Sequence, residues 1–469
     1  MVQGNWFEFR NNDTGTEVSL NEGATRNASW FAKASIVFAA WHDPVARIFN
    51  VDLLAVAMAI LLPWSTSGVI IFAVLWIIAL IPTFEPRAFL RLLRRPICLT
   101  PIALFVLTLA GTLWSDASWD ARIHAVGPTA KLLVLPLLLY HFQRTARGSW
   151  ILIAFLASST LLMLASWVTG FVPTLTFKWY MEPGVVVKNH IDQSHVFALC
   201  AMALVWPIMF LVRAKKFAGA GLLALCAVGF AANMVFINLS RTVLIAVPII
   251  VGIVVLHLTS WRHLIGALGA LAILGGLCWS VSPVLRAKTA SLFPPYRLYE
   301  PTNEPTSIEI RYQYWRKSIE FIREAPLFGH GTGSIRPLFE QAAINQTNVA
   351  AEVTSNPHNQ TLSVAIQWGI AGVVALYAVW LSHIALFWRG GWSGSVGFLI
   401  VVQNIVSSLL NSHLFDFQEG WIYVLGVGVA GGMALRERNS LRGRSLASGT
   451  RPQAVTAPAM TACASRQMP

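Results

Sequence analysis

A histidine followed by two spaced glycines is the sharpest pattern in this sequence. His358 and Asn359 stand directly before a long apolar segment; nine residues separate Asn359 from Gly369, and two residues separate Gly369 from Gly372. Pro357 restricts the backbone on the approach to the histidine. A neutral imidazole has a reference pKa of about 6.5 and suits a general base near neutral pH. The pattern indicates either a catalytic base, with Asn359 as a hydrogen-bond partner, or a structural imidazole at a helix cap.

Three cations could bind an anion: two stand at the ends of apolar segments, and one lies in the long polar stretch before residue 360. Arginine offers a planar fork of donors that matches phosphate, which makes Arg241 and Arg311 candidates for that task. Arg241 fills a minimal turn between two apolar segments, where a buried cation is costly and the alternative is a structural ion pair. Lys188 and Asn189 precede another apolar segment, but a lysine at such a boundary is ordinary.

The composition shows which elements must hold these side chains. Of 469 residues, 55% are hydrophobic and only 12% are charged, and the mean hydropathy is +0.60. Soluble proteins carry about 25% charged residues, and no soluble fold of this size could cover so much apolar surface. Soluble enzymes and disordered chains are therefore excluded, and an all-α polytopic membrane protein is predicted. The five cysteines form no CxxC or Cys/His cluster, so neither a zinc site nor a disulfide framework is indicated.

Twelve apolar segments are candidates for membrane helices, which need about 20 residues each. They lie at 50–64, 67–83, 98–113, 126–141, 149–172, 191–212, 217–238, 242–258, 263–283, 360–386, 393–411 and 420–436. The predicted organisation is a cytoplasmic N-terminal segment at 1–49, nine membrane helices within 50–283, a large periplasmic loop at 284–359, three membrane helices within 360–436, and a basic disordered cytoplasmic tail at 437–469.

The distribution of Lys and Arg predicts which side of the membrane each loop faces. Twelve spans place both termini on one side, and 21 of the 34 Lys and Arg fall in the termini and loops of that side. Because short loops rich in Lys and Arg stay in the cytoplasm, both termini are predicted to be cytoplasmic. The net charge of +13 then reflects topology and contact with anionic lipids rather than nucleic-acid binding.

The large loop is expected to contain a helix, because its apolar residues recur at helical spacing. They are Ile308, Tyr312, Trp315, Ile319 and Ile322. We expect this helix to lie on the outer membrane surface, where Arg311 either reaches lipid phosphates or merely snorkels.

Two further groups of residues are given structural interpretations. The glycine-rich run at 329–333 has no strand before it, so it is expected to turn the chain rather than to bind phosphate. His413, Asp416 and Glu419 fall in the last outer loop and are interpreted as solvated loop residues.

Together these features resemble a known family. His358 and Asn359 followed by Gly369 and Gly372 resemble the signature of bacterial O-antigen ligases. The stretch from Arg311 to Gly329 is similar to the large-loop motif of the wider superfamily, which also contains O-antigen polymerases and protein O-oligosaccharyltransferases. The arrangement of twelve spans with one large periplasmic loop before the tenth resembles that family too.

The resemblance implies an integral-membrane glycosyltransferase fold (C-type) in the bacterial inner membrane, with a periplasmic active site. Such ligases transfer O-antigen polysaccharide from undecaprenyl pyrophosphate to a sugar hydroxyl of lipid A–core in lipopolysaccharide biosynthesis, with inversion and without a metal or cofactor. By position, the resemblance makes His358 the essential histidine and Arg311 and Arg241 the essential arginines, with Lys188 as a weaker match. Asn359, Asn189, Gly369 and Gly372 are the supporting residues.

Several alternatives stay open. A polymerase would use a growing glycan as acceptor and a protein glycosyltransferase would use Ser or Thr hydroxyls, and the sequence separates these poorly from a ligase. A transporter would place charges or broken helices at mid-membrane, but here Lys131 is the one exception to ionisable groups at span ends. Between the two loop histidines, His358 is preferred as the base because His330 lies between glycines, where the backbone is least restrained.

Overall fold

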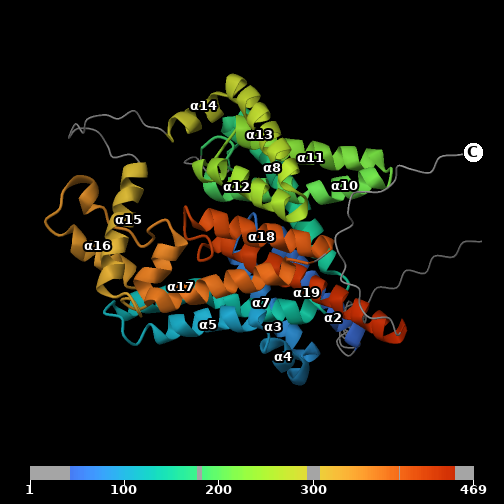
Figure 1. The fold of residues 1–469 in the computed structure, drawn as a ribbon, viewed down its shortest axis with the longest axis horizontal. Helices are drawn as coiled ribbons and strands as arrows, with labels where there is room; N and C mark the ends of the chain where they lie inside the picture. Colours follow the sequence, from blue (N-terminus) through green and yellow to red (C-terminus); the bar gives the residue numbers. More distant parts are fainter. Residues whose placement is uncertain (1–42, 177–181, 293–306, 390, 449–469) are drawn as a thin grey trace, which may run out of the picture.

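The described part of the chain is helical throughout. A computed structural model describes residues 43–176, 182–292, 307–389 and 391–448, and within these ranges there is no strand (Figure 1). Most of the predicted N-terminal segment, residues 293–306 of the large loop and the end of the predicted tail lie outside these ranges. An all-α fold is thus confirmed for the residues that position the candidate site.

The helices follow the predicted apolar segments closely, but the prediction of a disordered tail from residue 437 is wrong up to Ser448, where α19 ends. Their bounds are α2 Pro44–Leu61, α3 Thr66–Leu80, α4 Pro86–Leu93, α5 Pro96–Ala110, α6 Trp119–Ala130, α7 Val134–Phe142, α8 Gly148–Phe171, α9 His190–Ala203, α10 Val205–Arg213, α11 Phe217–Phe236, α12 Arg241–Leu258, α13 Trp261–Val281, α14 Pro283–Ala290, α15 Ser307–Glu324, α16 Ile335–Ala343, α17 Gln360–Phe387, α18 Trp392–Ser408 and α19 Phe417–Ser448. Each of the twelve predicted apolar segments coincides with one of these helices or with a consecutive pair.

Nine of the described helical segments are long and apolar enough to cross a membrane, or ten if the bent pair α4–α5 counts as one span. The apolar helix α18 is shorter, at 17 residues. The segment Trp119–Phe142 joins α6 and α7 into one continuous span. Lys131 lies in its middle, where its Nζ donates to the main-chain carbonyls of Phe415 and Asp416. A polytopic membrane protein is therefore confirmed.

The outer surface of the helix bundle is apolar, as contact with lipid requires. On α3, Ile70, Ile71 and Val74 are half exposed, whereas Trp76 on the opposite face is fully buried. The peripheral α13 has no buried residue along its length. Exposed apolar side chains on this scale would be unusual on a soluble monomer.

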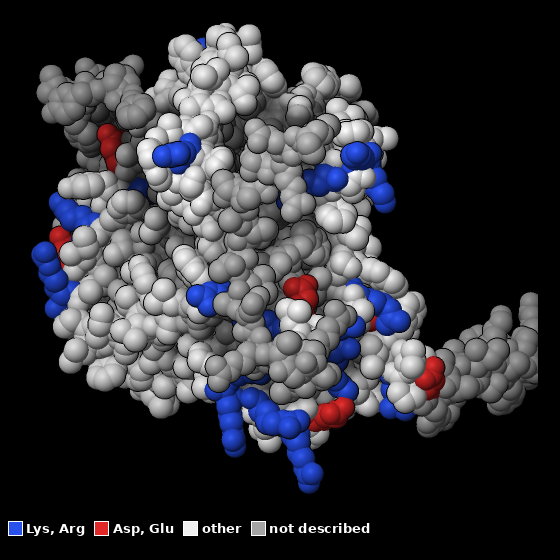
Figure 2. Space-filling model, turned by 45° about the vertical axis from the view of Figure 1, so that its right-hand side comes forward, with Lys and Arg blue, Asp and Glu red and all other residues white. Residues whose placement is uncertain are grey.

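Positive charge collects toward one end of the bundle. Exposed Arg and Lys residues flank α4 and follow α10, toward the end of the molecule away from α15 and α16 (Figure 1). With that end turned forward, Figure 2 shows many blue side chains and few red ones around broad uncharged areas. The exposed cations of α4, of the turn after it and at or just after the end of α10 are Arg87, Arg91, Arg94, Arg95, Arg213, Lys215 and Lys216.

Helix α17 is broken one-third of the way along, and the break has a clear cause. Trp368 and Gly369 leave the helical conformation, and Gly369 has a φ of 56°. The segment 326–333 packs into the break: His330 N–H donates to the Ile366 carbonyl at 2.9 Å, and Ile370 N–H donates to the Pro326 carbonyl at 2.9 Å. Backbone groups released by the break are thus satisfied by this segment, which we call the glycine strap.

The glycines of the strap and of α17 are needed where the two backbones meet. A Cβ on Gly369 would lie 2.4 Å from the Leu327 carbonyl carbon, and one on Gly329 would lie 2.5 Å from that of Gln367. Glycine is the residue that tolerates such an approach. The prediction that the 329–333 run turns the chain is confirmed, and the same run also fixes the outer loop to a membrane helix.

The outer helices α15 and α16 form a small core of their own beside α17 (Figure 1). Tyr314 and Phe321 of α15 pack against Phe339 of α16. The predicted apolar stripe is only partly on this buried face, because Ile308, Tyr312 and Ile319 are exposed. The sequence period located the helix but placed its buried face about a third of a turn away from where the structure has it.

Candidate active site

His358 lies at the junction between the outer helices and α17. Its backbone has a φ of 54°, which is uncommon for a residue other than glycine. The Asn356 side chain stabilises this turn, since its Oδ1 accepts from His358 N–H at 2.9 Å. Trp315 of α15 donates from Nε1 to the Pro357 carbonyl at 3.0 Å, and the Tyr314 ring lies nearly parallel to the imidazole at 6.2 Å. Helix α15 therefore holds the turn that presents His358.

The hydrogen bonds of the Asn411 side chain determine which nitrogen of His358 carries the proton. Asn411 Nδ2 donates to the Asp416 carboxylate at 2.8 Å, so its Oδ1 is the atom that faces His358 Nδ1 at 2.9 Å. An amide oxygen can only accept, so Nδ1 carries the hydrogen. Among the described residues none hydrogen-bonds Nε2, which is left with a free lone pair. This is the tautomer that a general base requires.

The surroundings of His358 keep its imidazole neutral. Burial lowers its pKa, the hydrogen bond with Asn411 raises it, and the nearby charge of Arg311 lowers it again. The more distant charges of Asp416 and His413 act in opposite directions. The net shift is downward from the ordinary value of a histidine, so the neutral form dominates at neutral pH.

The two arginines singled out in the sequence influence each other electrostatically, and Arg311 also acts on His358. Burial lowers the pKa of Arg311, and the nearby positive charge of Arg241 lowers it further. Arg241 is the first residue of α12, directly after the cap Ser240, so the N-terminal end of this helix adds positive potential. Two neighbouring guanidinium groups at a helix N-terminus form a site suited to a phosphate or pyrophosphate.

Lys188 lies apart from the arginines and already has partners. Its Nζ donates to the Leu62 carbonyl at 2.9 Å and lies 5.6 Å from the centre of the Phe417 ring. Burial lowers the pKa of Lys188, while the charges of Asp192 and Glu419 raise it. This lysine therefore faces acidic neighbours.

The predicted supporting residues cap helices or allow the backbone to bend and pack closely. Asn189 caps α9 by accepting from Ile191 N–H and Asp192 N–H, both at 2.9 Å. Asn359 caps α17 in the same way, accepting from Leu362 N–H at 3.1 Å. Its amide donates to the Leu409 carbonyl, so the partner of His358 is Asn411 rather than Asn359. Gly369 forms the break in α17, and a Cβ on Gly372 would lie 2.7 Å from that of Trp368.

His330 is held by the protein rather than left loose. Its Nε2 donates to the Phe321 carbonyl at 2.8 Å, and its backbone joins the glycine strap to α17. The expectation that the backbone around His330 is loosely held is therefore wrong, because the glycine strap is hydrogen-bonded to its neighbours along its length. With Nε2 engaged to a carbonyl, His330 has a structural task.

The last outer loop contains residues that the sequence reasoning missed. His413 is fully buried and Glu419 is 6% exposed, so their interpretation as solvated residues is wrong. Asp416 lies 3.2 Å from His413 and holds the Asn411 amide. His413, Asp416 and Glu419 have ligand atoms within 4.8 Å of one another and could hold a metal ion. The one signal in the sequence was three ionisable residues within seven positions, which is equally typical of exposed loops.

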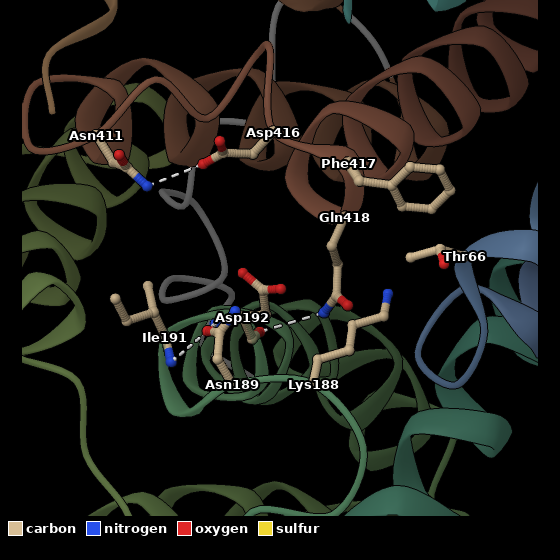
Figure 3. A pocket seen from close by; sticks show the side chains of 9 residues that line it. All are labelled: Thr66, Lys188, Asn189, Ile191, Asp192, Asn411, Asp416, Phe417 and Gln418. Atoms are coloured by element: carbon tan, nitrogen blue, oxygen red, sulfur yellow. Dashed lines mark hydrogen bonds between the residues drawn. The ribbon is translucent and has the colours of Figure 1, made fainter. Parts of the chain in front are cut away.

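A polar pocket of about 260 Å³ opens between α9 and the connection from α18 to α19. Figure 3 shows Lys188, Asn189 and Asp192 on one side and Asn411, Asp416 and Gln418 on the other, with Phe417 beside Thr66. Gln418 spans the pocket floor by donating to the Asp192 carbonyl at 3.3 Å. Because Asn411 both lines the pocket and bonds His358, the pocket lies next to the histidine.

Comparison with known proteins agrees with this geometry. Residues 226–377 match a family described as O-antigen ligase. A protein of Haemophilus influenzae, described as uncharacterized, is 26% identical over 269 residues, which cover 55% of this chain and 65% of that relative. The family segment runs from α11 into α17 and contains Arg241, Arg311 and His358. Through this segment, which carries all three of the central site residues, the chain is similar to the O-antigen ligase family.

Proposed function

We propose that the protein is an O-antigen ligase of the bacterial inner membrane. In this proposal it transfers O-antigen polysaccharide from undecaprenyl pyrophosphate to a sugar hydroxyl of lipid A–core. The family match supports the ligase and polymerase superfamily. The observation that carries the chemistry is His358 with Nδ1 engaged and Nε2 free, placed beside two arginines.

The donor already has a good leaving group, so the protein must do two things. His358 Nε2 takes the proton of the acceptor hydroxyl as its oxygen attacks the anomeric carbon, with inversion. The bond from that carbon to the pyrophosphate oxygen breaks, and Arg311 and Arg241 stabilise the negative charge that develops there. Each charge-assisted hydrogen bond contributes about 1.5–3 kcal/mol, and fixed donors act best where water is excluded.

The proposed orientation follows from the distribution of charge. The arginine-rich turns near α4 and α10 face the cytoplasm and the α15–α16 end faces the periplasm, as the preference of Lys and Arg for cytoplasmic loops requires. A cysteine introduced at Gln346 should then react with a membrane-impermeant thiol reagent added from the periplasm, and one at Ser445 should not. The reverse labelling pattern would refute both the orientation and the periplasmic site.

Deletion of the gene tests the function directly. Loss of a ligase leaves rough lipopolysaccharide and accumulates long lipid-linked O-antigen, whereas loss of a polymerase leaves chains of a single repeat on lipid A–core. The single-repeat pattern would replace the proposed function by the polymerase alternative. In this proposal two arginines neutralise the leaving group, so a chelator should not affect transfer by the purified protein. Inhibition by the chelator that a divalent ion reverses would implicate His413, Asp416 and Glu419 as metal ligands.

A further inference from the structure

We propose that the polar pocket between α9 and the α18–α19 connection is the subsite for the acceptor sugar, a single neutral pyranose ring. This inference rests on the proposed function and deepens it, because it assigns donor and acceptor to different groups of residues. The donor pyrophosphate lies on Arg311 and Arg241, whereas the acceptor lies on Asp192, Asn411, Asp416 and Phe417.

The charge of the pocket disfavours a phosphate group. Two carboxylates, Asp192 and Asp416, reach into the same space from opposite sides, and Lys188 is the single cation among the lining residues (Figure 3). That cation lies within the influence of Asp192 and Glu419 and donates to a main-chain carbonyl. A pyrophosphate placed here would meet a net negative lining, and like charges at close range repel.

The same lining suits a polyhydroxylated ring. Carboxylates accept hydrogen bonds from hydroxyl groups, and amides such as Asn411 both donate and accept. The Phe417 ring adds an apolar face on which the C–H side of a pyranose can pack. A lipid chain would leave these polar groups without partners, which is costly. The volume of about 260 Å³ has room for a single sugar ring but not for a polysaccharide.

The position of the pocket fits the acceptor rather than a remote sugar site. Asn411 lines it and accepts from Nδ1 of His358, so the pocket adjoins the histidine through this amide. The arginines come from α12 and α15, on other elements. The cationic group and the acidic pocket are thus separate sets of residues, as expected of an anionic donor and a neutral acceptor.

Photo-crosslinking tests the assignment without requiring turnover. Phe417 is replaced by p-benzoylphenylalanine in a His358→Ala background, in cells that contain both lipid A–core and lipid-linked O-antigen, and the matched control carries the same group at Tyr312. Tyr312 is 64% exposed on α15. We expect an adduct with lipid A–core at position 417 and none at 312. An adduct with the lipid-linked glycan at 417, or no adduct, would overturn the acceptor assignment, and the deletion phenotype independently reports whether the protein is a ligase.

Kinetics of the purified protein provide a second test. Phe417→Ala should raise the KM for lipid A–core about two- to tenfold, the value of one aromatic contact, while the KM for the donor stays unchanged. Phe417→Trp keeps a ring face and should restore most of the affinity. Lys188→Ala distinguishes between two roles for this lysine. If Lys188 belongs to the acceptor subsite, the substitution should raise the KM for lipid A–core. A higher KM for the donor would instead assign Lys188 to the pyrophosphate and overturn its place in the acceptor subsite.

Discussion

Two of the clusters in which a histidine and a carboxylate share a hydrogen-bond network have different surroundings. In the first, which we call the Asp52 cluster, the fully buried Asp52 of α2 accepts hydrogen bonds from His141 Nε2 at 2.8 Å, Thr145 Oγ1 at 3.0 Å and Arg147 Nη1 at 3.1 Å. In the second, His358 engages Nδ1 through Asn411 and Asp416 and keeps Nε2 free. The first cluster is closed on itself, and the second opens onto a pocket.

The difference shows what separates a structural cluster from a reactive one. Asp52 joins α2 to the end of α7 and the start of α8, so its hydrogen bonds connect membrane helices. A carboxylate that already accepts from three donors has little capacity left for a substrate. In the His358 cluster the carboxylate acts through an amide, which orients the imidazole and leaves its other nitrogen for chemistry.

The largest expected effect is on His358. His358→Ala should lower the rate of transfer about 10²–10⁴-fold, the usual contribution of a general base, with protein level and donor binding intact. His330→Ala is the matched control, because its imidazole bonds a backbone carbonyl and transfer should be largely retained. Transfer by purified protein from a lipid-linked donor measures both. A loss below about tenfold at His358 would indicate a positioning role instead.

Asp52→Ala should affect stability rather than chemistry. Removal of one partner from a buried charged network costs about 3–5 kcal/mol, because the other groups are left without compensation. We expect a large decrease in the thermal unfolding temperature of the purified protein. The fraction that remains folded should transfer glycan at a near-normal rate. Loss of activity in stably folded protein would contradict the structural assignment of this cluster.

The arginines should respond to the shape of the side chain as well as to its charge. Arg311→Lys and Arg241→Lys keep the charge but lose the planar fork, so the rate should drop about tenfold to a hundredfold while folding survives. Arg323→Lys, exposed on the same helix as Arg311, serves as control. Full activity in both variants would exclude bidentate recognition of the pyrophosphate.

The sequence predicted those features that depend on local pattern. Apolar length located a helix at each of the twelve predicted segments, although only nine or ten of the described helical segments are long and apolar enough to cross a membrane. The His-Asn and glycine motif located His358 and the break at Gly369. Residue type alone pointed to Arg311 and Arg241, which lie 70 residues apart in the chain but close together in the fold.

The remaining features depend on contacts between distant segments. Asn411 and Asp416 reach His358 across more than 50 residues, and nothing in their own sequence context distinguishes them from a solvated loop. The hydrogen bond between His330 Nε2 and the Phe321 carbonyl forms only because the glycine strap packs into α17. Likewise, the buried face of α15 was set by α16 and could not be derived from the periodicity of α15 alone.

The smallest effect is expected in the pH dependence of Asp416→Asn. A general base works only when neutral, so kcat/KM falls as the pH drops through the pKa of His358. Burial holds this pKa below the ordinary histidine value, against the upward effects of Asn411 and Asp416. Removing the Asp416 charge removes one upward effect, so the acid limb of the profile should move to lower pH, with a modest loss of rate because the Asn411 amide is less firmly oriented. Glu340→Gln, an exposed acid on α16, should leave the profile unmoved. A shift of the limb to higher pH in Asp416→Asn would mean that the carboxylate does not act on His358, and the contrast with the closed Asp52 cluster would lose its basis.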